Sequence, residues 1–247
     1  MQRWCGTTAV VTGANGGIGA AISVGLANAG VNVVGIDVCL NILNELQLEV
    51  KGEGRIIPRQ CDISKPQQVM ETFKWIDEQL KGSHILVNCA GVLYQGHITD
   101  AGSNTLSDDQ IHKTIDVNLK GMIFSTRHAI ASMKHHVIDG HIININSIAG
   151  HYIPFADNMN VYATTKHAVT AFTASLNTEL AAFKNKIKIT SMSPGLVSTP
   201  MASYVEELKM PALQPRDLAD AVLYVLSTPP HVNIGELTIT PVTEKRL

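Results

Sequence analysis

Short apolar segments rich in β-branched residues alternate along this chain with longer segments whose apolar residues recur at helical spacing. The first segments of the two kinds are Thr8–Thr12 and Ile18–Ala29, and the alternation continues to Glu236–Thr240. Strands that alternate with helices form a parallel sheet, because right-handed crossovers place the helices on both faces. The sequence therefore predicts one α/β domain over residues 1–247, with a Rossmann-type doubly wound parallel sheet of about seven strands.

The other elements follow from the same two patterns. We expect strands at Val31–Asp37, Arg55–Cys61, His84–Asn88, His141–Asn146 and Lys186–Met192, and helices at Leu40–Val50, Pro66–Leu80, Ser107–His136, Val161–Phe183 and Asp217–Leu226. Ligands of such sheets bind beyond the carboxyl ends of the strands. The residues that follow each strand are therefore the first candidates for function.

Composition excludes several classes of protein. The chain is 45% hydrophobic and 16% charged, which is unlike a disordered or fibrous protein. Its net charge of −2 and its lack of Lys/Arg runs argue against nucleic acid or a membrane surface as a partner. No apolar run is long enough to span a bilayer, and Met1–Gly6 leaves no room for a signal peptide. The four cysteines form no CxxC pair, and no metal-ligand spacing occurs, so we expect a cytoplasmic protein with reduced thiols and no metal.

A glycine-rich segment, Thr12–Gly19, follows the first expected strand and opens the first expected helix. Gly13 permits a tight turn, Gly17 lets the backbone approach a pyrophosphate, and Gly19 allows close packing of helix on strand. The free N–H groups and the dipole of the helix start favour phosphates. A plain loop has the same composition, but the position between strand and helix favours dinucleotide binding.

Asp37 ends the second expected strand, at the place where a carboxylate accepts hydrogen bonds from the adenine ribose of NAD. An NADP phosphate carries about −1.5 to −2 charges, which Asp37 would repel. Neither Val38 nor Cys39 supplies a compensating arginine. The alternative is a solvated carboxylate at a strand end. NAD is therefore the expected cofactor, and NADP the less favoured one.

Tyr162 and Lys166 lie four residues apart on an expected helix, so their side chains face the same way. An ammonium about 4 Å from a phenol contributes roughly 4 kcal/mol at an effective dielectric of 20. That equals about three pKa units and would bring the phenol near neutrality, where a general acid/base works best. We expect Ser147 to hydrogen-bond the substrate oxygen and Asn118 to orient a water between Lys166 and solvent. Each residue alone also fits a surface pair or a turn.

With these residues the chain resembles the short-chain dehydrogenase/reductase family over essentially its whole length. The matching pieces are Thr12–Gly19, Asp62, Asn88–Gly91, Asn118, Ser147, Tyr162, Lys166 and Pro194–Thr199. The resemblance implies a catalytic tetrad of Asn118, Ser147, Tyr162 and Lys166, with Lys166 also holding the nicotinamide ribose. It further implies cofactor contacts, which for the whole chain we expect from Gly13, Asn15, Gly17, Ile18, Gly19, Asp37, Asp62, Ile63, Asn88, Ala90, Gly91, Tyr162, Lys166, Pro194, Gly195, Val197 and Thr199.

Within the family, the segment His141–His151 is most similar to insect farnesol dehydrogenases and to vertebrate carbonyl and steroid reductases. Those relatives usually carry a small residue and then arginine after the second strand, and they prefer NADP. Here the chain reads Asp37-Val38. It also has Cys89 where the family commonly has a second asparagine, so one polar group below the cofactor is missing.

A substrate pocket is expected from 93–97, 150–159 and 201–211, with residues 196–214 as a short substrate-binding loop region. Their apolar side chains suit a terpenoid, a steroid or another lipophilic alcohol, although core or dimer contacts would look the same. The expected substrate contacts are Leu93, His151, Tyr152, Met201 and Tyr204. For His151, a structural hydrogen bond is the more common role of a lone histidine.

The sequence thus predicts an NAD-dependent oxidoreductase that interconverts a lipophilic, farnesol-like alcohol and its aldehyde or ketone. One alternative is an NADPH-dependent carbonyl or ketosteroid reductase, which runs the same chemistry in reverse. Another is a catalytically silent dinucleotide-binding sensor or scaffold, which would not need the four tetrad residues together. The resemblance also implies a homodimer or homotetramer built on the helices around 107–136 and 161–183.

Overall fold

The computed structural model describes residues 1–99, 104–154, 156–202 and 210–244. Its centre is a seven-stranded sheet in the order β3-β2-β1-β4-β5-β6-β7 with every pair parallel. This confirms the predicted Rossmann-type sheet. The strands are β1 (Thr8–Thr12), β2 (Asn32–Asp37), β3 (Ile56–Gln60), β4 (Ile85–Asn88), β5 (His141–Ile145), β6 (Lys188–Pro194) and β7 (Glu236–Ile239).

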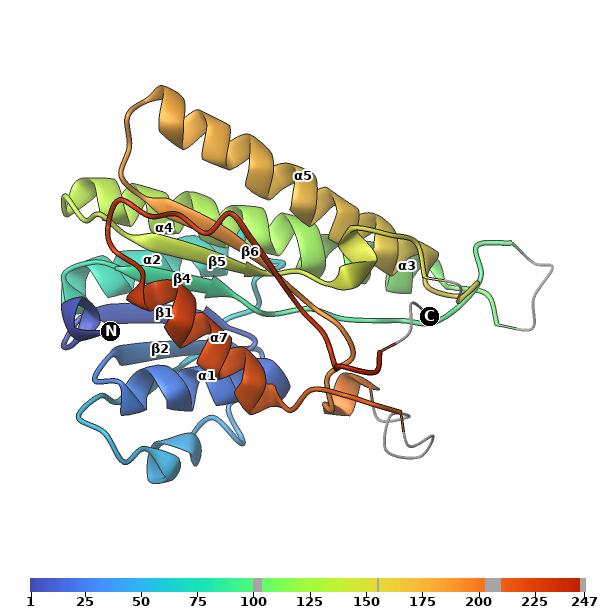
Figure 1. The fold of residues 1–247 in the computed structure, drawn as a ribbon, viewed down its shortest axis with the longest axis horizontal. Coiled ribbons are helices and arrows are strands. Elements are labelled where there is room, and N and C mark those ends of the chain that lie inside the picture. Colours follow the sequence, from blue (N-terminus) through green and yellow to red (C-terminus); the bar gives the residue numbers. More distant parts are fainter. Residues whose placement is uncertain (100–103, 155, 203–209, 245–247) are drawn as a thin grey trace.

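The helices cover both faces of the sheet, as Figure 1 shows. Helices α1 (Gly17–Asn28) and α7 (Pro215–Ser227) pack on one face. Helices α2 (Pro66–Leu80), α4 (Met122–His135) and α5 (Asn160–Ala182) pack on the other, and α3 (Asp108–Ile115) leads into α4. All five residues of β1 are buried, because a strand between two helical layers has no solvent face. Ligands of a doubly wound sheet bind at the carboxyl ends of its strands, so this edge is the first candidate for the site.

One expected helix is wrong. Residues 40–50 form an irregular turn with a short 3-10 helix at Leu46–Glu49 only. The amide of Leu43 donates to Asn15 Oδ1 at 2.9 Å instead of to a helical carbonyl, and Leu43 is fully buried. Leu48, on the same segment, is exposed. The apolar spacing thus comes from two buried side chains, Leu43 and Leu46, that anchor a loop, and not from one face of a helix.

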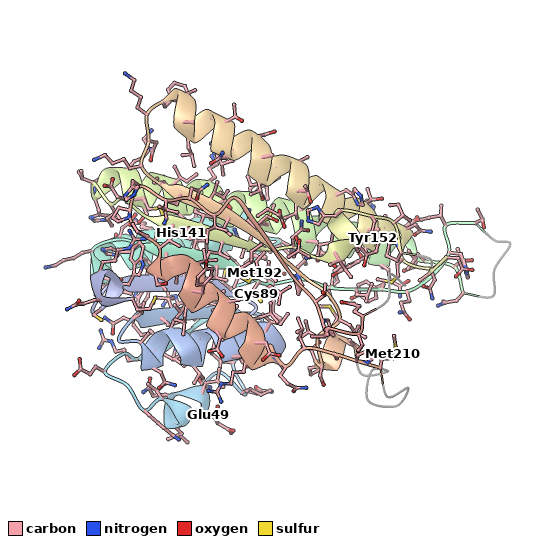
Figure 2. All side chains as sticks on the ribbon, in the orientation of Figure 1. Glu49, Cys89, His141, Tyr152, Met192 and Met210 are labelled. Carbon is pink, nitrogen blue, oxygen red and sulfur yellow. The ribbon has the colours of Figure 1, made fainter. Side chains whose placement is uncertain are left out.

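The strand order reverses between β1 and β4, which are neighbours in the sheet although β2 and β3 lie between them in the chain. A doubly wound sheet binds its ligand at such a switch point. Figure 2 shows Tyr152 and Met210 on the side where the strands end, and His141 on the opposite side. Within the described residues, no helix is long and apolar enough to cross a membrane.

Candidate active site

The loop between β1 and α1 packs closely against its neighbours because glycines stand at its tight positions. A Cβ on Gly13 would come within 2.7 Å of the Ala90 main chain, and Gly13 has a φ of +69°. A Cβ on Gly19 would overlap the carbonyl of Gly13, so glycine at this position lets α1 pack closely against the loop after β1. The first residue before α1, Gly16, offers no side chain to cap the helix. The first N–H groups of α1 therefore stay available for an anion, as a dinucleotide pyrophosphate requires.

Asp37 lies at the end of β2 on the wall of a cavity of about 560 Å³. Its Oδ2 accepts from the amide of Asn15 at 3.0 Å, and its Oδ1 accepts from the amide of Cys39 at 3.2 Å. These bonds fix the carboxylate beside the glycine loop. The same cavity is lined by Gly13, Asp62, Ile63, Ala90 and Gly91, all of which the sequence predicts as cofactor contacts.

Asp62 is held in the same cavity wall by its own local turn. Its Oδ1 accepts from the amide of Ser64 at 2.9 Å and from the Ser64 hydroxyl at 2.7 Å. Its main-chain amide donates to Gln68 Oε1 at 2.7 Å. The fixed carboxylates of Asp37 and Asp62 in the wall of this cavity can accept hydrogen bonds from donors such as ribose hydroxyls and an adenine amino group.

Tyr162 and Lys166 lie side by side on α5, and Ser147 faces them from the end of β5. All three line one cavity of about 190 Å³. Lys166 Nζ is 5.6 Å from the centre of the Tyr162 ring and donates to the carbonyl of Ile145 at 3.0 Å. Burial lowers the pKa of Lys166 to about 8. The geometry thus places a cation next to the phenol, in a site where solvent screens it little.

Ser147 begins a short 3-10 helix, Ile148–Gly150, and its hydroxyl accepts from the amide of Ala149 at 3.1 Å. This bond uses one acceptor site of the hydroxyl and fixes the side chain. The hydroxyl proton of Ser147 is left for an oxygen in the cavity.

Asn118 lies in a π-helical turn, Asp116–Gly121, between α3 and α4, so the long helix expected over 107–136 has an irregular centre. Its Oδ1 accepts from the amide of Val92 at 2.8 Å, and its Nδ2 donates to the carbonyl of Val92 at 2.9 Å and to Thr165 Oγ1 at 3.3 Å. The side chain thus ties the segment after β4 to α5. Both amide protons are engaged, so a water bound by Asn118 would donate to the second acceptor site of Oδ1 or to the main-chain carbonyl.

Asn88, the last residue of β4, and Cys89, which follows it, have different roles. Asn88 Nδ2 donates to Asn144 Oδ1 at 2.8 Å and to Thr126 Oγ1 at 2.9 Å, so the side chain joins strands and helices below the site. Cys89 lines the cavity of Tyr162 and Lys166, and burial raises the pKa of its thiol to about 12. Cys89 is therefore a neutral, weakly polar wall.

The substrate residues expected from the sequence fall into three groups. Leu93, Tyr152 and Met201 line the cavity beside Tyr162. His151 does not line this cavity. Its Nε2 lies 2.8 Å from Ser193 Oγ and 3.2 Å from Glu236 Oε1, so the side chain links β6 to the first residue of β7. Tyr204 lies outside the described residues.

The cofactor residues expected after β6 lie on the same cavity. Pro194, Gly195, Val197 and Thr199 line it from the end of β6 and the loop that follows, and Ile18 lines it from the start of α1. Gly17 is next to this group, because a Cβ on Gly17 would contact the Thr199 side chain at 3.3 Å. Sequence reasoning missed two polar lining residues, Asn146 and Glu244. A single glutamate after the last strand carries no signal that its chain segment returns to the site.

The observed cradle therefore fits the dinucleotide that the sequence implies. Gly91 lines both the cavity at Asp37 and the cavity at Tyr162, and the start of α1, which has no side-chain cap, contributes Ile18 to the second. Among the described residues no group of His, Cys, Asp and Glu has a geometry that holds a metal ion. A nucleotide cradle that leads to a phenol, a lysine and a serine hydroxyl defines a dinucleotide-dependent oxidoreductase acting on CH–OH groups.

Comparison with known proteins agrees. Residues 7–209 match the family model described as short chain dehydrogenase. The chain is 40% identical to a farnesol dehydrogenase of Aedes aegypti over 99% of this chain and 100% of that protein. It is 38% identical to dehydrogenase/reductase SDR family member 11 of Mus musculus, over 98% and 96%. The structure superposes on an alcohol dehydrogenase of Thermococcus sibiricus complexed with 5-hydroxy-NADP, with a TM-score of 0.83, 25% identity and coverage of 97% and 98%. The chain belongs to the short-chain dehydrogenase family.

Proposed function

We propose that this protein is an NAD-dependent oxidoreductase that interconverts a lipophilic alcohol, of the farnesol type or similar, and its aldehyde or ketone. The observation that carries the proposal is the cavity that Tyr162, Lys166 and Ser147 share with an otherwise largely apolar wall. The similarity to a farnesol dehydrogenase supports the same substrate class. A panel of terpenoid, steroid and short-chain alcohols, assayed with both cofactors, tests the proposal.

In the direction of oxidation, the substrate hydroxyl donates its proton to the Tyr162 phenolate while Ser147 holds the oxygen by a hydrogen bond. The Lys166 cation, 5.6 Å from the Tyr162 ring, stabilises the negative charge of the phenolate. A bound nicotinamide cofactor would supply the acceptor for the hydride that leaves the carbinol carbon. In reduction Tyr162 returns its proton to the carbonyl oxygen. The apolar wall excludes water, which strengthens each of these electrostatic contacts.

Different residues would bind different parts of the cofactor. The first turn of α1, from Gly17 to Gly19, would receive the pyrophosphate. Asp37 would bind the adenine ribose, and Val197 and Thr199, which line the cavity of Tyr162, would bind the nicotinamide carboxamide. Lys166 would contact the nicotinamide ribose.

Asp37 leads to a prediction about cofactor choice. We expect the protein to use NAD at least about tenfold more efficiently than NADP in kcat/KM, because a fixed carboxylate repels the additional phosphate. The double variant Asp37→Ser/Val38→Arg reverses the preference, since it removes the repulsion and adds a guanidinium at an exposed position. Steady-state kinetics with both cofactors measures this.

The single variant Val38→Arg is the matched control. Its guanidinium lies next to the retained carboxylate, so the preference changes by less than about threefold. A preference of the unmodified protein for NADP contradicts the assignment of Asp37. It would instead favour the second candidate, an NADPH-dependent carbonyl reductase, which the 5-hydroxy-NADP complex of the Thermococcus sibiricus enzyme supports.

The same proposal includes the location and assembly of the protein. All four cysteines are free in the structure, which fits a reducing compartment such as the cytoplasm. Assembly into a homodimer or homotetramer through α4 and α5 follows from the family resemblance. Light scattering of the purified protein tests it.

A further inference from the structure

The chain after β7 brings a carboxylate to the wall of the active-site cavity. The amide of Glu244 donates to the carbonyl of Pro241 at 3.0 Å, which closes a turn. Glu244 Oε1 accepts from the amide of Leu196 at 2.9 Å. Glu244 lines the same cavity as Ser147 and Tyr162. The tail and the loop after β6 thus form one wall of the site.

The position of this carboxylate is fixed by the main chain. The amide of Gly195 donates to the carbonyl of Ile239 at 2.8 Å, which joins the loop to the start of the tail. A Cβ on Gly195 would overlap Glu244 Oε2, so the carboxylate lies directly against the glycine. A side chain at position 195 would displace the carboxylate from its present place.

One oxygen of the carboxylate has no donor. Glu244 Oε2 is buried and has no hydrogen-bond partner among the described residues. A buried acceptor without a donor is unfavourable, and native proteins keep few of them without a reason. Burial also raises the pKa of the Glu244 carboxyl, which shows the same lack of compensation. A donor supplied by a ligand would remove the penalty.

The surrounding wall explains which ligand can supply it. The cavity is otherwise lined largely by apolar side chains, including Leu93, Ile148, Tyr152, Met159 and Met201. The reacting oxygen would be bound by Ser147, which follows β5, and by Tyr162 on α5. Glu244 belongs to a different segment and has no part in that chemistry. A substrate that satisfies both groups has an apolar body and two polar ends.

We propose that Glu244 is a specificity-determining residue that accepts a hydrogen bond from a second donor group of the substrate, a hydroxyl or an ammonium. This inference rests on the proposed function, and among the lipophilic alcohols it favours those with a second donor group over those, such as farnesol, that carry one hydroxyl only. A hydrophobic pocket discriminates weakly between similar apolar substrates, whereas a buried polar group left unpaired discriminates strongly.

Pairs of simple alcohols test the proposal. Each straight-chain primary alcohol from butanol to decanol is compared, by kcat/KM, with the diol and the amino alcohol of the same length that carry the second group at the far end. At the length that fits, the protein prefers the second donor by about ten- to a hundredfold. Glu244→Leu removes the preference, and Glu244→Gln removes the preference for the ammonium. The inference is overturned if the wild type shows no preference at any length, or if Glu244→Leu leaves the ratios within about twofold.

Glu49→Leu is the matched control, because Glu49 is exposed on the turn after β2, away from Tyr152 and Met210 in Figure 2. Calorimetric titration of the same compounds into the protein with NAD gives binding ratios that do not depend on turnover. If no alcohol of any kind is oxidised, the proposed function fails, while the binding ratios still decide the role of Glu244. If the alcohols are oxidised and the ratios ignore Glu244, only the inference fails.

Discussion

Tyr162→Phe lowers turnover by about a thousandfold with every alcohol that the wild type oxidises. The variant removes only the hydroxyl that accepts the substrate proton, while the ring keeps its contact with Lys166. Asp37 and the glycine loop are unchanged at the other cavity, so the dissociation constant for NADH changes by less than about threefold. Steady-state kinetics and a fluorescence titration of the bound cofactor measure the two quantities.

The matched control is Tyr224→Phe, whose tyrosine is 59% exposed on α7 and outside both cavities. It keeps the activity of the wild type. A Tyr162→Phe variant with nearly normal turnover refutes the general acid/base assignment. So does a variant whose loss of activity is matched by an equal loss of cofactor affinity, because the phenol would then act in binding.

Much of the fold could be predicted from local sequence patterns. The strand pattern and the helix pattern both arise because the residues pack in or against one sheet. The strands and long helices begin and end close to the expected residues, as β1 and α2 show. The failure at residues 40–50 has a physical cause. Leu43 and Leu46 are buried, as a helical face would require, but the Leu43 amide is held by Asn15 from the loop after β1. A distant hydrogen bond overrides local propensity there.

Some parts of the candidate site could likewise be predicted from the sequence, and others could not. Tyr162 and Lys166 are one helical turn apart, so their proximity follows from the sequence alone. The place of Asn118 in a π-helical turn does not, since its amide is fixed by Val92 and Thr165. Glu244 is the extreme case. It bonds the amide of Leu196, 48 residues earlier, and only the course of the chain after β7 brings the two together.

Lys166 makes stability depend on pH in a defined direction. Burial lowers its pKa from 10.5 to about 8, whereas the unfolded chain keeps the ordinary value. Between these two pH values the unfolded state binds more protons, so the free energy of unfolding rises with pH. Below about 8 the full cost of the buried charge is present, and above 10.5 it is gone. The difference between the two pKa values of Lys166 corresponds to about 3 kcal/mol in the free energy of unfolding.

The comparison is made between Tyr162→Phe and Tyr162→Phe/Lys166→Met, so that the phenol does not titrate in either protein. Urea denaturation at a series of pH values is expected to show the lysine-containing protein gaining about 3 kcal/mol relative to the methionine variant across that window. The lost bond from Lys166 Nζ to the Ile145 carbonyl shifts the difference by a constant and leaves its slope unchanged. Lys51→Met, at an exposed position, gives a flat difference as the control. Parallel curves for Lys166 would mean that its charge is not destabilised by burial, and the phenolate would then have no unscreened cation beside it.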